Sequence, residues 1–247
     1  MTAIQTLALS NYLRLSMKSG VSAMEVFDFK ENWCDENKII AGLIRKKAAK
    51  YFVPPILDVG AGLGDIAYNA FADKKAICID VNKITEEDCP LSENHKREQA
   101  DFFDYIPNEQ ISTLFISHTL QFIDEDIERL NKKIREINPT YVILVLNDNT
   151  DFMGTLIEWV EENFEDPNPE VHIAGFPKNY DLLKKIPFKA TLRCQDFDKL
   201  AKQIGYLMVV DLKETVEELK GFLKQRLGKK PKFTFKQTIE IYQRNGR

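Results

Sequence analysis

The sequence predicts an α/β fold built on a doubly wound, mostly parallel sheet. After the prolines at 54 and 55, short apolar runs alternate with helical stretches. Apolar runs of this kind are typical of strands that are buried on both faces of a parallel sheet. Alternating strands and helices imply right-handed crossovers between neighbouring strands. The expected early strands are Ile56–Val59, Ala76–Ile79, Ile111–Ser117 and Tyr141–Leu146.

The remaining elements are predicted with the same rules. Residues 1–50 have apolar positions at helical spacing and form an expected N-terminal helical cap, ahead of a main domain over 51–247. Further helices are expected over 124–137, 150–164 and 196–204. Two late strands are expected at Tyr206–Leu212 and Phe233–Gln243. Residues 165–195 are interpreted as an insertion near these late strands.

Composition and charge restrict the class of protein. A net charge of -4 and an isoelectric point near 5.6 disfavour a general nucleic-acid binder, although residues 224–236 are rich in lysine. The four cysteines are scattered and there are only three histidines, so no metal site is expected. No signal peptide is recognised and no run reaches the roughly 18 apolar residues of a membrane span. We therefore expect a cytoplasmic protein with no membrane partner.

The stretch Ile-Leu-Asp-Val-Gly-Ala-Gly-Leu-Gly-Asp at 56–65 carries the strongest functional signal. It follows an expected strand and opens an expected helix, a position where glycines let a ligand approach the backbone. A dinucleotide fingerprint would have its third glycine at position 65, which is Asp65. A carboxylate there would oppose a pyrophosphate, so the spacing argues against a nicotinamide dehydrogenase.

The pattern from Asp58 to Gly64 resembles the first motif of the class I S-adenosylmethionine-dependent methyltransferases. The resemblance implies a seven-stranded, Rossmann-like sheet with an N-terminal helical lid, and S-adenosyl-L-methionine as the cofactor. In that family the turn wraps the methionine part of the cofactor and the acidic residue lies near its ammonium group. The residues implied for this part of the site are Asp58, Gly60, Ala61, Gly62 and Gly64.

Two further segments match the cofactor site of that family. Asp80 ends the next apolar run about twenty residues on, where a carboxylate would accept hydrogen bonds from both ribose hydroxyls and Val81 would lie beside it. Asp101 and Phe102 resemble the adenine-binding position, with an acceptor for the exocyclic amine and an apolar cover for the ring. An exposed strand-end aspartate and an ordinary loop pair are the structural alternatives.

The stretch 116–123 resembles the family's fourth motif, which borders the transferring methyl group. It assigns Ser117 to the cofactor site and makes His118 the candidate general base, because a neutral imidazole can accept a proton near pH 7. A histidine that packs near the cofactor or caps a helix is the alternative. A catalytic base need not exist, because the cofactor already activates the methyl group.

The sequence gives the least information about which residues contact the methyl acceptor. Trp33 of the expected lid, with His172 and Tyr180 of the 165–195 segment, are candidates for contacting the acceptor, and core or surface roles are the alternatives. Ser117-His118-Thr119 stands where enzymes that methylate amino groups of nucleic acids carry an Asn/Asp-Pro-Pro-Tyr type motif. This favours methyl transfer to an oxygen or nitrogen of a small metabolite, with nucleic acid disfavoured as a partner.

Two other functions stay open. A protein or RNA methyltransferase could use the lysine-rich stretch 224–236 for docking. The chain could also be a non-catalytic partner protein that binds the cofactor, because the glycine motif indicates cofactor binding and does not indicate turnover. The acceptor, the pathway and the formation of a homodimer are not determined by the sequence.

Overall fold

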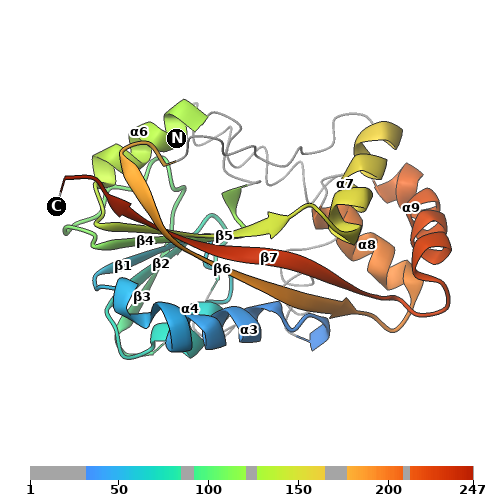
Figure 1. Cartoon of the computed structure of the whole chain (residues 1–247), viewed down its shortest axis with the longest axis horizontal. Coiled ribbons are helices and arrows are strands. Elements are labelled where there is room, and N and C mark those ends of the chain that lie inside the picture. The colour runs from blue at the N-terminus through green and yellow to red at the C-terminus, as the bar shows by residue number, and fades with distance from the viewer. Residues whose placement is uncertain (1–31, 85–91, 121–126, 165–176, 208–211, 247) are drawn as a thin grey trace. The chain divides into compact units, whose positions relative to one another are not determined.

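The computed structural model describes residues 32–84, 92–120, 127–164, 177–207 and 212–246. Seven strands form one mixed, mostly parallel sheet in the order β3-β2-β1-β4-β5-β7-β6 (Figure 1). The strands are β1 Ile56–Val59, β2 Ala76–Asp80, β3 His95–Gln99, β4 Thr113–Ser117, β5 Tyr141–Asp148, β6 Tyr180–Arg193 and β7 Lys232–Arg244. The predicted fold class is confirmed. The expected lid over 1–50 falls largely on residues outside the described part.

The helices occur between the strands, as the alternating pattern predicts. They are α3 Glu36–Leu43, which continues into the π-helical turn η1 Ile44–Ala48 and the 3-10 turn η2 Ala49–Tyr51, then α4 Asp65–Phe71, α6 Ile127–Ile137, α7 Phe152–Asn163, α8 Phe197–Leu207 and α9 Leu212–Leu227. The predicted strand Tyr206–Leu212 is wrong at both ends, because Tyr206 and Leu207 belong to α8 and Leu212 begins α9. None of the described helices is both long and apolar enough to cross a membrane.

The chain divides into two compact units. One comprises Met1–Glu36, Asn147–Glu170 and Lys189–Lys236, and the other comprises Asn37–Leu146, Val171–Phe188 and Gln237–Arg247. The second unit contains β1 to β4 and most of β5. The first contains α7, α8 and α9, with an aromatic cluster in which the Trp159 and Phe222 rings stack at a centroid distance of 4.4 Å. Residues 180–193 of the range expected as an insertion form β6.

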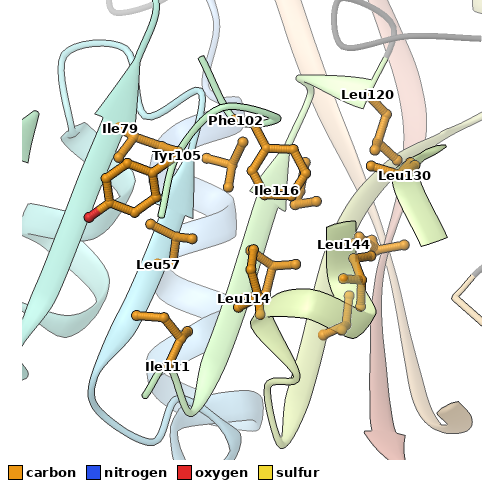
Figure 2. Packing of buried hydrophobic residues seen from close by; sticks show 14 of the residues in the cluster. Leu57, Ile79, Phe102, Tyr105, Ile111, Leu114, Ile116, Leu120, Leu130 and Leu144 are labelled. Carbon is orange, nitrogen blue, oxygen red and sulfur yellow. The ribbon is translucent and has the colours of Figure 1, made fainter. Parts of the chain in front are cut away.

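Two hydrophobic clusters cover the opposite faces of the sheet in the second unit. On one face, β-strand residues such as Leu57, Ile79 and Ile116 pack with Leu130 of α6 (Figure 2). On the other face, the strands pack with Ala67 and Phe71 of α4. Figure 1 shows α6 on one side of the sheet and α4 on the other. Burial on both faces explains why these strands are apolar throughout.

The strand order reverses between β1 and β4, and this reversal determines where a ligand can bind. β1 pairs in parallel with β2 on one side and with β4 on the other, and β2 and β4 pair in parallel with β3 and β5. Open α/β sheets bind ligands at such a switch point, beyond the carboxyl ends of the strands. The candidate site therefore has to be sought beyond Val59, Asp80 and Ser117.

Candidate cofactor site

The glycine turn joins β1 to α4 at this edge of the sheet. Gly60, Gly62 and Gly64 have φ angles of 65°, 53° and 83°, in the left-handed region that favours glycine. The Ala61 N–H donates to the Ile79 carbonyl at 3.0 Å, which ties the turn to β2. The alternating glycines are thus explained by the backbone conformation of the turn itself.

Gly60 also packs against the segment that follows β4. A Cβ atom at this position would overlap the side chain of Thr119. The Thr119 hydroxyl donates either to the Val59 carbonyl at 3.2 Å or to the Ser117 carbonyl at 2.9 Å. The two loops that border the switch point are therefore fitted to each other around one glycine.

Asp80 is at the end of β2, and its carboxylate faces the glycine turn. Its Oδ2 accepts from the Gly62 N–H at 2.9 Å, and its Oδ1 accepts from the backbone and side-chain nitrogens of Asn82 at 2.9 and 2.8 Å. These bonds leave at least one lone pair of the carboxylate for a ligand hydroxyl, and the Asn82 side-chain bond can be exchanged for a second. Val81, which follows, is 44% exposed.

Asp58 is the buried acid of the site, with only 3% of its surface exposed. Burial, and then the charge of Asp80, raise the pKa of its carboxyl group from 3.8 to about 7, while the charge of Arg97 lowers it. An aspartate in this state ionises most readily when a cation lies beside it. Its position therefore suits the ammonium group of a ligand that enters at the turn.

Arg97 is a residue of this site that the sequence analysis did not identify. Its guanidinium reaches across from β3 and donates to the carbonyls of Gly62 and Leu63 at 2.8 and 2.7 Å. The strand that carries it, His95–Gln99, is charged and was not predicted, so the sequence offered no signal for a contact with the turn.

The predicted adenine position forms a tight loop. Asp101 Oδ1 accepts from the Phe103 N–H at 2.8 Å, and Lys133 of α6 donates to the carbonyls of Phe103 or Tyr105, each at 2.7 Å. Phe102 is 4% exposed and packs in the core cluster beside Ile116 (Figure 2). Its role as a cover for an adenine ring stays a prediction. Lys133 is a further contact that only the tertiary structure brings to this loop.

Ser117 and His118 lie at the carboxyl end of β4, as predicted. The Ser117 hydroxyl oxygen is buried and has no hydrogen-bond partner in the described part of the chain. His118 has a φ angle of 52°, which is uncommon for a residue other than glycine. Its Nε2 lies 3.3 Å from the Nε2 of Gln237, a buried residue of β7. An amide group has both a donor and an acceptor, so Gln237 can bond this nitrogen in either tautomer of the ring.

The residues predicted to contact the acceptor fall in different parts of the chain, and their role stays a prediction. Tyr180 donates its hydroxyl to the Pro139 carbonyl at 2.9 Å, just ahead of β5, and so lies at the edge of the sheet opposite to Asp80 and Ser117. Trp33 belongs to the other compact unit, where Lys199 Nζ lies 5.6 Å from its ring centroid. His172 lies outside the described residues.

Comparison with known proteins supports the fold. No protein-family model and no curated protein sequence matches the chain. Among solved structures, a cyclopropane-fatty-acyl-phospholipid synthase-like protein from Lactobacillus casei ATCC 334 is 13% identical, with a TM-score of 0.56 over 83% of this chain and 90% of that one. The N-methyltransferase NodS from Bradyrhizobium japonicum WM9, in complex with S-adenosyl-L-homocysteine, is 10% identical, with a TM-score of 0.53 over 96% and 99% of the two chains. The chain has the fold of the class I S-adenosylmethionine-dependent methyltransferases.

Proposed function

We propose that this protein is an S-adenosylmethionine-dependent methyltransferase that acts on an oxygen or nitrogen atom of a small metabolite. The observation that carries the proposal is the Asp80 carboxylate held 2.9 Å from the Gly62 N–H, beyond the carboxyl ends of β1 and β2. The carboxylate proposed to accept from the ribose and the turn of left-handed glycines are thus joined by one hydrogen bond, at the switch point of the sheet.

The residues present fit this cofactor in charge and in shape. The remaining lone pairs of Asp80 suit the ribose hydroxyls, and Asp58 suits the ammonium group. The buried Ser117 hydroxyl has no partner among the described residues, as is expected where a ligand completes a site. When bound, the cofactor supplies a methyl group that is already activated on a sulfonium.

The work left to the protein is positioning and proton handling. The glycine turn and Asp80 would orient the cofactor. His118 is proposed to receive the acceptor's proton, from its place at the carboxyl end of β4 with Nε2 beside Gln237. The Gln237 amide nitrogen faces Nε2, so a ring that carries its proton on Nε2 requires the Gln237 amide to turn and present Oε1 as the acceptor.

Support for a small acceptor comes from the sequence that follows β4. Ser117-His118-Thr119 occupies the place where a nucleic-acid amino-methylating enzyme carries its Pro-Pro-Tyr type motif. Of these three residues, Thr119 packs against Gly60 and donates to the Val59 carbonyl, so its side chain is engaged with the glycine turn.

Calorimetry with S-adenosyl-L-homocysteine and with NAD tests the proposal. We expect S-adenosyl-L-homocysteine to bind and NAD to give no heat of binding. Asp80→Ala should weaken S-adenosyl-L-homocysteine by roughly ten- to a hundredfold, because a charge-assisted hydrogen bond contributes about 1.5–3 kcal/mol. Asp148→Ala, which removes the aspartate that ends β5, is the matched control and should leave the affinity nearly unchanged. Equal affinity of Asp80→Ala and the wild type would place the cofactor elsewhere.

Methyl transfer then separates the remaining functions. With cofactor labelled on its methyl group, label should enter the low-molecular-weight fraction of a metabolite extract. Label in the protein or RNA fraction instead would favour the docking role of residues 224–236. Tight binding with no transfer to any fraction would favour a non-catalytic partner protein.

A further inference from the structure

Three strands of the candidate site present a row of polar side chains in register. Asp58 of β1 is aligned with Cys78 of β2, and Cys78 with Arg97 of β3. Residues aligned across neighbouring strands share one face of a sheet, and Asp80, two residues beyond Cys78, lies on that face as well. Two carboxylates and one guanidinium therefore lie on the same face, beneath the glycine turn.

Arg97 fixes the conformation of the turn above this row. Its two terminal nitrogens donate to the consecutive carbonyls of Gly62 and Leu63. A planar guanidinium can bond two adjacent oxygens at once, whereas a lysine ammonium acts as a point charge. The orientation of the Gly62 N–H, which bonds Asp80, is thus held from the carbonyl side of the same residue.

The charges in this row do not balance. Asp58 and Asp80 would carry two negative charges against the single positive charge of Arg97. The thiol of Cys78 stays neutral, because burial and then the charge of Asp58 raise its pKa. Of the other side chains that pack on this face, Phe115 of β4 and Ala67 and Phe71 of α4 cannot titrate. His95 of β3, which packs against Phe71, can titrate, but burial lowers the pKa of its imidazole from 6.5, so it adds no positive charge near pH 7. One charge is left to be neutralised, either by a proton or by a ligand cation.

We propose that Arg97 is a positioning residue of the cofactor site, which clamps the glycine turn and balances one of the two carboxylates, so that cofactor binding releases a proton from Asp58. The inference rests on the proposed function, because the entering cation is the ammonium group of the cofactor. Without the cofactor, a proton on Asp58 completes the neutralisation. When the ammonium group arrives, it replaces that proton, which passes to the buffer.

Calorimetry of the wild-type chain with S-adenosyl-L-homocysteine measures this proton directly. The binding enthalpy is recorded at one pH in buffers of different ionisation enthalpy, and its slope gives the number of protons released. With the pKa of Asp58 near 7, about half a proton should leave at pH 7. The number should approach one about a pH unit lower and fall towards zero near pH 9. Asp58→Asn should show no such slope.

Substitutions at Arg97 separate its two roles. Arg97→Gln should weaken S-adenosyl-L-homocysteine by roughly ten- to a hundredfold and release more protons above pH 7, because Asp58 holds its proton more firmly without the guanidinium. Arg97→Lys keeps the charge, so it should release nearly the wild-type number of protons while binding more weakly than the wild type. Arg135→Gln, at an exposed arginine of α6, is the control for net charge and should match the wild type.

The outcomes distinguish this inference from the proposed function. No binding of S-adenosyl-L-homocysteine by the wild type at any pH would overturn both. Binding by the wild type with no change in protonation between pH 6 and pH 9 would overturn the inference alone, and this measurement requires no variant to fold. Wild-type affinity and proton number in a folded Arg97→Gln variant would overturn the role of Arg97.

Discussion

Asp58→Asn is expected to make the cofactor-free protein more stable at pH 8 and to leave its stability at pH 5 almost unchanged. The folded-state pKa of Asp58 is about 7, against 3.8 for the ordinary group. The folded state therefore holds a proton that the unfolded state releases between these values, and the wild type loses stability as the pH rises from about 4 to about 7. The full cost above pH 7 is on the order of 4 kcal/mol.

Part of that cost remains in the variant, because a buried amide also needs hydrogen-bond partners. We therefore expect a net gain of roughly 1–3 kcal/mol at pH 8. Denaturant titration at both pH values, with the exposed Asp73→Asn as the control, measures the difference. A variant that is less stable than the wild type at pH 8 would show that Asp58 is ionised at no cost in the fold. The same substitution should weaken S-adenosyl-L-homocysteine, so stability and cofactor affinity oppose each other at this residue.

His118→Ala is expected to lower turnover of the acceptor by about 10²- to 10⁴-fold while cofactor affinity changes little. The reason is that a general base contributes to the chemical step, whereas Asp80 and the glycine turn hold the cofactor. The loss should shrink at high pH, where the acceptor deprotonates without help. Steady-state kinetics over a range of pH, with the acceptor found by the methyl-transfer screen, give both quantities.

Gln237 supplies an independent test of the same role. Gln237→Met removes the polar partner of His118 at similar volume and should lower turnover, while Gln237→Glu retains an acceptor for Nε2–H and should restore it. Gln203→Met, at another buried glutamine, is the control for the loss of a buried amide. A loss below about tenfold in His118→Ala, with an unaltered pH profile, would leave positioning as the whole contribution of the histidine.

The fold could be predicted from the sequence wherever a strand is buried on both faces. The two strands that were not predicted, β3 and β6, are the two edges of the sheet. β3 has the sequence HKREQ, and β6 carries Lys184, Lys185 and Pro187. Charged residues and proline on edge strands prevent pairing with other chains, so these strands lack the apolar pattern on which prediction depends.

In the candidate site, the residues at the ends of the buried strands could be predicted from the sequence, and the residues that reach the site from other elements could not. Asp58, the glycines and Asp80 lie at strand ends, which the sequence locates. Arg97, Lys133 and Gln237 reach the site from an edge strand, a helix and the last strand, over separations of 28 to 119 residues. Contacts at such separations follow from the sheet order and not from any local spacing. The place of Tyr180 has the same origin, because β6 begins at Tyr180 beside the residues that precede β5.

The fit between Gly60 and Thr119 has a consequence for how related chains can diverge. The Thr119 side chain occupies the space that a Cβ atom at position 60 would need, so the two positions cannot change independently. A lineage that acquires alanine at position 60 should survive best when position 119 has already become glycine. Correlated substitution at this pair is therefore expected in an alignment of homologues, and the double change Gly60→Ala with Thr119→Gly should be less harmful than Gly60→Ala alone.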